Sequence, residues 1–468
     1  MQRPSRVRML VGALLCSLGL AALAGAAPAL ASHNETVYFE AHELLNAKAR
    51  PRVLSELKWL GVKALRVELY WREVAPRPNS RRRPKFNQAS PSGYHWGQYD
   101  ALLSTAAALH WPVLLTVTAP GPKWAMAGHR DYVTRPSDSD FEQFMQAVGR
   151  HFGKEVSMYA IWNEPNHPDY LKPQFRGHTP LSPAIYRGLF LSGYAGLRKG
   201  GVSNPKVLMG ETAPTGTARV VSPLAFLRGA LCLNSHYQKV GHCGELPAYG
   251  YAHHAYTKAS GPFYRPPNRD DVMIAVLSRL TNALDLAARA GAIKPNMDIY
   301  LTEFGIQSKP NRYFGVPVAQ QAEYDAIAER IAYENPRVAA FSQYLLRDDK
   351  LGGRPGSAVI GFQTGLEYVN GRRKPLYYGW PVQLAVARAG SGFSLWGHVR
   401  PTEGPTTATV LIQRPGSRSY TTLRTVHTDS EGYWSFTSPV SGEHWRLQWT
   451  SPSGVKHLGP PIRSYRGP

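Results

Sequence analysis

The stretch Tyr159-Ala160-Ile161-Trp162-Asn163-Glu164-Pro165-Asn166 determines how the rest of the chain is interpreted. Its first half is a continuous apolar run, which predicts a strand buried on both faces, as in a parallel sheet. Asn163 and Glu164 would then project from the carboxyl end of that strand, the end that carries the active site in barrels of alternating strands and helices. Because an ordinary exit from a strand into a loop has similar residues, the rest of the chain must decide.

Around this stretch the chain alternates short apolar runs with longer amphipathic segments. Strands are expected at residues 37–40, 64–69, 113–117, 157–162, 206–209, 249–253, 298–301 and 338–344. Helices are expected at residues 53–60, 100–109, 137–152, 183–198, 223–231, 270–290, 319–333 and 376–387. This eightfold alternation predicts an α/β fold, a (β/α)8 TIM barrel over residues 32–389. A doubly wound open sheet is the alternative, but no glycine-rich phosphate loop follows the first strand.

The hydrophobic pattern of the sequence changes after residue 389, where helical periodicity disappears. Short alternating runs predict antiparallel strands at residues 393–399, 408–413, 420–427, 433–436 and 445–449. Their spacing favours a small immunoglobulin-like β-sandwich over residues 390–468. Trp434, Trp445 and Trp449 could bind sugar there, or they could pack in the core of the sandwich.

The amino-terminal segment has the three parts of a secretory signal peptide. Arg3, Arg6 and Arg8 form a positive start, residues 9–23 an apolar run, and Ala29-Leu30-Ala31 a small-residue cleavage site. We expect cleavage after Ala31 and a secreted protein. The apolar run is short for a membrane anchor, and no later stretch is long enough to cross a bilayer.

Two cysteines remain after this leader, Cys232 and Cys243. An oxidising compartment predicts one disulfide between them, which closes a short loop. Two free thiols are the alternative.

The chain is strongly basic, with a formal net charge of +22, of which the leader arginines contribute three. The densest basic run, residues 77–85, is flanked by prolines and is expected in an exposed loop. Such a charge favours anionic partners, for example an acidic glycan or a cell-envelope polymer, or it is simply a solvated surface. No nucleic-acid-binding motif accompanies it.

A second strand ends in a carboxylate at Glu303, which follows Asp298-Ile299-Tyr300-Leu301-Thr302. Glycoside hydrolases use two carboxylates, about 5 to 5.5 Å apart when they retain the anomeric configuration. Two barrel strands can bring the Glu164 and Glu303 side chains this close together at the carboxyl end of the barrel. Glu68 and Glu211 also lie near expected strand ends and could contact substrate.

Together, Ile161-Trp162-Asn163-Glu164-Pro165 and Leu301-Thr302-Glu303-Phe304-Gly305 resemble the two catalytic signatures of glycoside hydrolase clan A. The resemblance covers about residues 37–387 and is nearest to the β-xylosidase and α-iduronidase family or to cellulase-like relatives. Supporting segments are Gly61 to Arg66 with Trp71, Pro122-Lys123-Trp124, His254-Ala255-Tyr256, and Gly365-Leu366 with Gly371 and Lys374-Pro375. One departure is Ser342-Gln343-Tyr344, where many clan members have a tryptophan.

The resemblance implies a role for each of these residues. Glu303 would be the nucleophile, kept ionised by Arg66 and Tyr256, and Glu164 the acid/base, its pKa raised by the charge of Glu303. Asn163 would bind the sugar 2-hydroxyl.

Four further residues are candidates for substrate contact. His254 could bind sugar, orient a catalytic carboxylate or serve only a structural role, while Trp71, Trp124 and Tyr344 could stack on sugar or belong to the core. His253 beside His254 is expected to be structural, since adjacent strand residues face opposite sides and no metal-ligand spacing is present.

The sequence therefore predicts a secreted, monomeric, retaining glycoside hydrolase that acts on a carbohydrate, with β-linked sugars favoured. We expect no cofactor and no metal. The alternative is a non-catalytic carbohydrate-binding or wall-associated protein that keeps the barrel as a scaffold.

Overall fold

The computed structural model describes residue 32, residues 35–350 and residues 361–467. The expected leader, residues 1–31, lies outside the described residues. Within the described part, no helix is long and apolar enough to cross a membrane.

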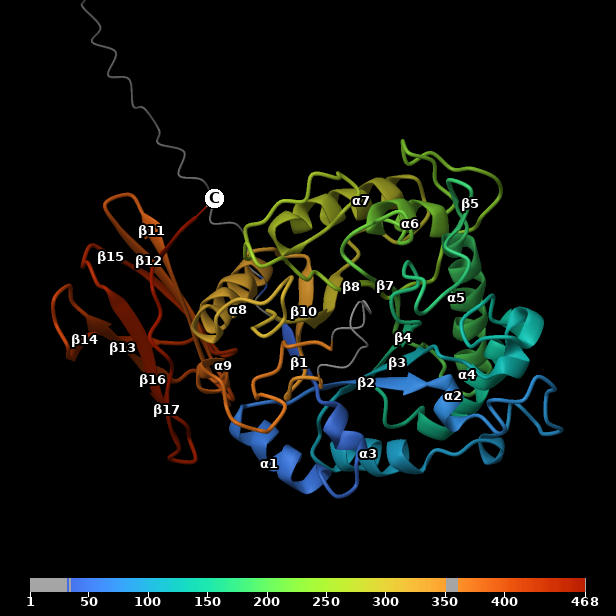
Figure 1. Cartoon of the computed structure of the whole chain (residues 1–468), viewed down its shortest axis with the longest axis horizontal. Helices are drawn as coiled ribbons and strands as arrows, with labels where there is room; N and C mark the ends of the chain where they lie inside the picture. Colours follow the sequence, from blue (N-terminus) through green and yellow to red (C-terminus); the bar gives the residue numbers. More distant parts are fainter. Residues whose placement is uncertain (1–31, 33–34, 351–360, 468) are drawn as a thin grey trace, which may run out of the picture.

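Eight parallel strands form a closed barrel in the order β1-β10-β9-β8-β7-β4-β3-β2 (Figure 1). They are β1 (Thr36–Glu40), β2 (Leu65–Tyr70), β3 (Val113–Thr118), β4 (Met158–Ile161), β7 (Val207–Thr212), β8 (Gly250–His253), β9 (Ile299–Phe304) and β10 (Val338–Tyr344). Each matches an expected strand to within a few residues. The TIM barrel is confirmed, and the closed strand order excludes the open doubly wound sheet.

Helices surround this barrel on its outer side (Figure 1). They are α1 (Arg50–Trp59), α2 (Trp71–Val74), α3 (Gly97–Ala108), α4 (Asp138–Phe152), α5 (Ser182–Lys199), α6 (Pro223–Ala230), α7 (Leu277–Arg289) and α8 (Val318–Tyr333). A two-stranded ribbon of β5 (Phe175–Arg176) and β6 (Thr179–Pro180) precedes α5. The helix expected from residue 270 begins only at Leu277, after a 3-10 turn at Ile274–Val276.

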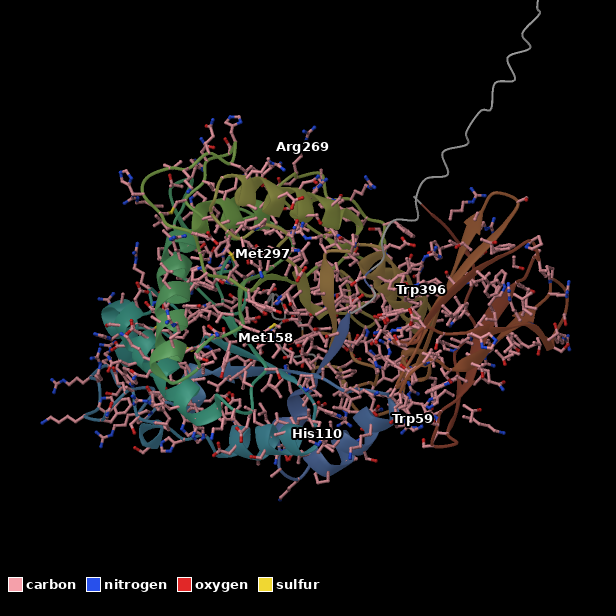
Figure 2. The ribbon with its side chains drawn as sticks, turned by 180° about the vertical axis from the view of Figure 1, so that it is seen from behind. Trp59, His110, Met158, Arg269, Met297 and Trp396 are labelled. Carbon is pink, nitrogen blue, oxygen red and sulfur yellow. A yellow bond between two sulfur atoms is a disulfide. The ribbon has the colours of Figure 1, made fainter. Side chains whose placement is uncertain are left out.

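The barrel encloses its own small core, separate from the larger core between strands and helices. Small and medium residues fill it, including Met158 at the start of β4, which is labelled in Figure 2. Outside the barrel, α4 and α5 pack closely because α5 carries glycines on the contact face. A Cβ at Gly193 would lie 2.5 Å from Ile161, so a side chain there would push against the strand that leads to Glu164.

Two four-stranded sheets follow the barrel, in the orders β15-β12-β11-β18 and β14-β13-β16-β17. Their strands are β11 (Val382–Ala389), β12 (Gly392–Val399), β13 (Thr407–Gln413), β14 (Tyr420–His427), β15 (Tyr433–Ser438), β16 (His444–Thr450), β17 (Lys456–Leu458) and β18 (Tyr465–Arg466). The pairing is antiparallel except between β11 and β18. One apolar core joins the two sheets, so the sandwich is confirmed. Trp434, Trp445 and Trp449 belong to this core, which favours packing over sugar binding.

The expected helix over residues 376–387 is wrong. Only Pro375–Gly379 is helical, as α9, and Pro381 then ends the helix because proline has no amide hydrogen to donate. The apolar run continues as β11, which pairs with β12 before the expected domain boundary at residue 389. Val382, Leu384 and Val386 face the sandwich core, whereas Ala385 packs toward α8.

The barrel and the sheets share a buried interface between α8 and the β12-β11 face. Trp396 lies in it, between the barrel and the sheets in Figure 2. Several polar contacts cross it. Among them, Gln383 Nε2 donates to Asp325 Oδ2 at 2.7 Å, His398 Nδ1 lies 2.6 Å from Glu329 Oε1, and Arg400 Nη2 donates to Glu329 Oε2 at 2.7 Å. Because buried charges persist only when paired, these contacts fix how the sheets sit on the barrel.

Candidate active site

Both expected catalytic glutamates lie at the carboxyl ends of barrel strands. Glu164 follows β4, and Glu303 is the fifth residue of β9. Glu303 is 5% exposed, and the Glu164 side chain is 18% exposed. The two residues therefore occupy one end of the barrel, the catalytic end of this fold.

The backbone that delivers Glu164 is unusual. Trp162 and Glu164 both have positive φ angles, 67° and 37°. Hydrogen bonds hold this conformation: Asn163 N donates to Thr118 Oγ1 at 2.8 Å, and Glu164 N donates to Glu211 O at 2.9 Å. Positive φ in residues other than glycine is costly and persists where the surrounding structure enforces it, which is common in active sites.

Arg66 is the centre of the charge network. Its buried guanidinium donates to Glu303 Oε2 at 3.2 Å, to Asn163 Oδ1 at 2.8 Å and to Glu211 Oε2 at 2.7 Å. It also donates to Glu40. One side chain on β2 thus positions groups from four other strand ends, as the planar guanidinium fork allows.

His254 contacts the two glutamates and Glu211. Its Nδ1 lies 3.1 Å from Glu164 Oε1 and 3.6 Å from Glu303 Oε2, and its Nε2 lies 3.0 Å from Glu211 Oε2. Burial alone would lower the pKa of His254, but the charge of Glu303 and the bonds to Glu164 and Glu211 raise it to about 10. The ring is therefore a cation at neutral pH, with both nitrogens donating. The ring therefore lies between three carboxylates.

The pKa directions of the two glutamates are the reverse of those expected. Burial raises the pKa of Glu303, and Arg66 and His254 only partly offset it. Burial alone would also raise the pKa of Glu164, yet the hydrogen bond and charge of His254 keep it below the usual value. The reason is that His254 donates to Glu164, whereas it lies beyond hydrogen-bond length from Glu303.

Tyr256 and Tyr344 complete the surroundings of Glu303. Tyr256 Oη donates to Glu303 Oε1 at 2.7 Å. The Tyr344 ring, at the end of β10, lies edge-on to Tyr256 with ring centres 6.4 Å apart. It also lies edge-on to His42 at 5.6 Å. Tyr344 therefore occupies the strand end where the clan commonly has tryptophan.

Trp71 and Trp124 do not fit the expected role as sugar platforms. Trp71 has no exposed surface and stacks on Phe144 with ring centres 5.2 Å apart. Trp124 is 2% exposed, lies edge-on to Trp71, and donates from Nε1 to Pro76 O at 3.1 Å. Neither ring has a face open to a ligand, so the core alternative holds for both.

His253 is structural, as expected. Its Nδ1 lies 2.9 Å from Thr212 Oγ1 and its Nε2 lies 2.8 Å from Val272 O. Burial lowers its pKa to about 4, so the ring is neutral.

Two site residues were underestimated from the sequence. Glu211 is fully buried between Arg66 and His254, which lower its pKa to about 2 against the effect of burial. Glu40, at the end of β1, accepts from Arg66 and lies 2.9 Å from His42 Nε2. Their only signal in the sequence is a carboxylate at a strand end, the signal that identified Glu164 and Glu303.

Cys232 and Cys243 form the expected disulfide, with Cα atoms 6.1 Å apart. The bridge closes the loop after α6, so the alternative of two free thiols does not hold.

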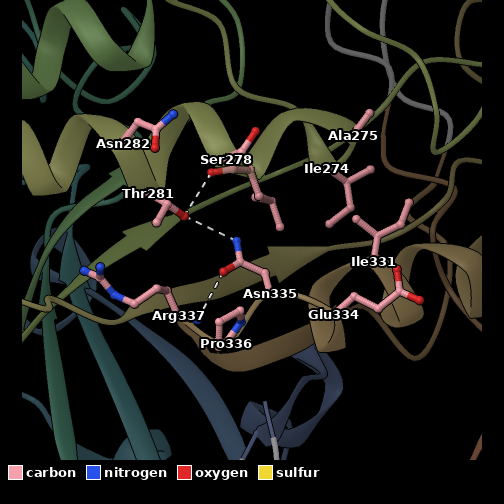
Figure 3. Close-up of a pocket in the computed structure, with 11 residues that line it drawn as sticks. Ile274, Ala275, Ser278, Thr281, Asn282, Ile331, Glu334, Asn335, Pro336 and Arg337 are labelled. Atoms are coloured by element: carbon pink, nitrogen blue, oxygen red, sulfur yellow. Dashed lines mark hydrogen bonds between the residues drawn. The ribbon is translucent and has the colours of Figure 1, made fainter. Parts of the chain in front are cut away.

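A separate cavity of about 370 Å³ lies between α7, the end of α8 and the residues that lead into β10 (Figure 3). Asn335 Nδ2 donates across it to Thr281 Oγ1 at 3.3 Å. Because Arg337 directly precedes β10, the cavity lies toward the amino ends of the strands. That end of the barrel supports stability, so this cavity is not part of the site.

Solved structures share the fold of this chain. A family 39 glycoside hydrolase from Bacteroides cellulosilyticus WH2 superposes with a TM-score of 0.53 at 16% identity, over 86% of this chain and 78% of that one. A glucosidase from Croceicoccus marinus matches with a TM-score of 0.49 at 9% identity, over 87% of this chain and 92% of that one. Xylanase 10B from Thermotoga maritima matches with a TM-score of 0.45 at 16% identity, over 74% of this chain and 94% of that one.

At these identities the likeness concerns the fold. No protein-family model and no curated protein sequence matches the chain. The site must therefore be interpreted from its own residues.

Proposed function

We propose that the protein is a secreted retaining glycoside hydrolase, with Glu303 as nucleophile and Glu164 as acid/base. The observation that carries this proposal is the contact of both carboxylates with one nitrogen, His254 Nδ1, while Arg66 and Tyr256 hold Glu303. Two carboxylate oxygens that both lie within 3.6 Å of one nitrogen are near neighbours. Such an arrangement favours direct attack by Glu303 over the wider gap, about 6.5 to 9.5 Å, that an inverting enzyme leaves for water.

In the first step a carboxylate oxygen of Glu303 attacks the anomeric carbon while the bond to the leaving oxygen breaks. Glu164 transfers its proton to that oxygen, which leaves as an alcohol. In the second step Glu164 takes a proton from water, the water oxygen attacks the anomeric carbon, and the bond to Glu303 breaks. Glu164 is thereby protonated again and Glu303 is free.

The pKa directions in the free site are opposite to those that the two steps need. Burial raises the pKa of Glu303, whereas the hydrogen bond and charge of His254 lower that of Glu164 against the effect of burial. We infer that bound substrate reverses these directions, since a leaving oxygen beside Glu164 stabilises its protonated form. The ionised Glu303 is then held by Arg66 and Tyr256.

Asn163 is suited to the sugar 2-hydroxyl. Its Oδ1 accepts from Arg66, so its NH2 group is the end left to donate to substrate. A hydrogen bond at this position can strengthen in the oxocarbenium-like transition state.

Secretion is supported by the disulfide and by the leader pattern of the sequence. We further infer that the protein acts as a monomer on a β-linked glycan. We also infer that its basic surface attracts an anionic glycan or envelope polymer. Mass spectrometry of the protein recovered from the medium should find Ser32 as the first residue.

The decisive experiment uses Glu303→Ala and Glu303→Gln on a broad glycan panel with product masses as readout. Both variants should lose hydrolysis, and azide should restore turnover of the alanine variant as a glycosyl azide of inverted configuration. A 2-fluorosugar that forms a covalent adduct should label Glu303. Glu245→Gln, which changes an exposed carboxylate two residues after Cys243, is the matched control and should remain fully active.

Full activity of either Glu303 variant, or a label on another residue, would contradict the assignment. Sugar binding without turnover by the wild-type protein across the whole panel would favour the non-catalytic scaffold.

A further inference from the structure

Glu68, like Glu211, has one buried oxygen without a hydrogen-bond partner among the described residues. It follows Arg66 by two residues on β2, so both side chains point to the same side of the strand. Its side chain is 6% exposed, and Tyr70 Oη donates to its Oε2. Within the part of the chain that the structure describes, Oε1 accepts no hydrogen bond, and Arg66 Nη2 lies 3.8 Å from it.

Most donors near Glu68 are already in use, and Arg66 Nε has no partner within the described residues. Arg66 donates hydrogen bonds to Glu40, Glu211 and Glu303. His254 donates to Glu164 and Glu211. Five carboxylates thus face two buried cations and the more exposed His42. Because acidic side chains outnumber basic ones here, the site attracts a positive group and repels a negative one.

The free oxygen lies beside other groups that could contact a ligand. Glu40, His42 and Glu68 each bring a ligand atom within 4.8 Å of the others. Burial, and then the charges of Glu303, Glu40 and Glu68, raise the pKa of Tyr344, which places its ring near the same carboxylates. One side of this cluster is therefore aromatic, and the nucleophile is adjacent.

An ammonium group matches this opening. It carries one positive charge and three donors, and it needs only acceptors around it. A uronic acid would instead bring a carboxylate against Glu68 and Glu40. Burial, and then the charge of Glu40, raise the pKa of Glu68 to about 7. A bound ammonium group stabilises the ionised form of Glu68, whereas a neutral hydroxyl that donates to Oε1 adds no positive charge.

We propose that Glu68, with Glu40 beside it, binds the ammonium group of an amine-bearing sugar in the subsite next to Glu303. This inference rests on the glycosidase function proposed above and specifies its substrate class. The cleaved sugar is a hexosamine with a free amine, within a chain that is otherwise neutral or anionic. A chain with an amine on every unit would be repelled by the basic protein outside the site.

A metal ion is the competing occupant of the same three side chains. His42 argues against it, because the hydrogen bond and charge of Glu40 raise its pKa to about 9, against the opposite effect of desolvation. The ring is then protonated at neutral pH and has no lone pair for a metal.

The test compares glycosides that differ in one substituent: hydroxyl, free amine or N-acetyl at the same carbon, with a uronate as the anionic member. For the wild-type protein, kcat/KM for the amine should exceed that for the hydroxyl by about tenfold or more. In Glu68→Gln this amine-to-hydroxyl ratio should fall by about tenfold, because the amide keeps the shape and removes the charge. Glu245→Gln should leave the ratio unchanged.

Calorimetric titration of the wild-type protein with glucosamine and glucose, or galactosamine and galactose, tests binding without turnover. Preference for the amine, lost in Glu68→Gln, supports the proposal. Equal rates for amine and hydroxyl, an unchanged ratio in Glu68→Gln, or activity removed by a chelator and restored by Ca²⁺ or Mg²⁺ would each overturn it. Hydrolysis of neutral glycosides without amine preference defeats only this inference, whereas failure to hydrolyse any glycoside defeats the proposed function.

Discussion

His254 Nδ1 lies 3.1 Å from Glu164 Oε1 and 3.6 Å from Glu303 Oε2, so one ring nitrogen contacts both proposed catalytic carboxylates. Its other nitrogen is fixed by Glu211. A cation at this point lowers the cost of keeping both glutamates charged. It therefore sets the pH range in which the pair holds one proton, as well as the orientation of Glu164.

Replacing His254 with Gln should move the pH profile. Without the imidazolium the pKa of Glu164 should rise, so the limbs of the kcat/KM profile should shift to higher pH. The rate at the optimum should fall by about 10²-fold, as for loss of one preorganised electrostatic partner. A pH-rate profile on one aryl glycoside measures both effects. His236→Gln, an exposed histidine, is the control, and a lower rate with an unshifted profile would contradict the electrostatic role.

Arg66 and Glu211 should depend on each other for stability. Arg66→Met leaves Glu211 buried without its guanidinium partner and should lower the free energy of unfolding by about 3 to 5 kcal/mol. The double variant Arg66→Met/Glu211→Gln should recover part of this loss, because it no longer buries an unpaired carboxylate. Denaturant unfolding of the four proteins of the cycle gives the coupling. Additive losses would show that the two residues do not form a pair.

Trp71 should matter for folding and not for substrate affinity. Trp71→Ala removes a fully buried ring stacked on Phe144 and should cost about 3 to 5 kcal/mol, with KM unchanged for the folded fraction. Tyr344→Ala is the contrast, since this ring lies beside Tyr256 and should alter KM. A raised KM in the Trp71 variant, measured well below its melting temperature, would restore it as a sugar platform.

The sequence predicts the barrel well because eight buried strands each leave a local apolar run. It identifies Glu164 and Glu303 because each follows such a run directly. The role of Glu211 depends on a register irregularity between Gly210 and Thr212 and on its φ of 49°, and neither is encoded in a local pattern.

The other wrong predictions concern residues whose burial the sequence pattern did not reveal. Trp71 follows a strand end and was expected at the barrel rim, but it begins α2 and its ring packs on Phe141 and Phe144 of α4. The run from Val382 was expected to be helical because strands buried on both faces and buried helices have similar composition. Pro381, which ends the helix, and the pairing with β12 distinguish the two.

The interface between α8 and the sheets should make stability depend on pH through Asp325. Burial, and then the charge of Glu329, raise the pKa of Asp325 to about 7, whereas an unfolded aspartate titrates near about 3.9. Between these values the folded state binds the additional proton, so this residue's contribution to stability is full below about pH 3.9 and is lost as pH rises through 7. In Asp325→Asn, the asparagine oxygen can still accept the hydrogen bond from Gln383, and the loss of stability at high pH disappears.

The Asp325→Asn variant should therefore melt above the wild-type protein at pH 8, and the difference should shrink toward pH 5. Glu329, whose pKa Arg400 and His398 lower to about 2 against burial, stays ionised throughout this range. His398 and Glu35 also titrate at this interface, but they are common to both proteins, so the difference between melting curves isolates Asp325. Asp169→Asn, with a side chain 70% exposed, is the matched control. A gain independent of pH would mean that the amide packs better rather than that a buried charge was removed.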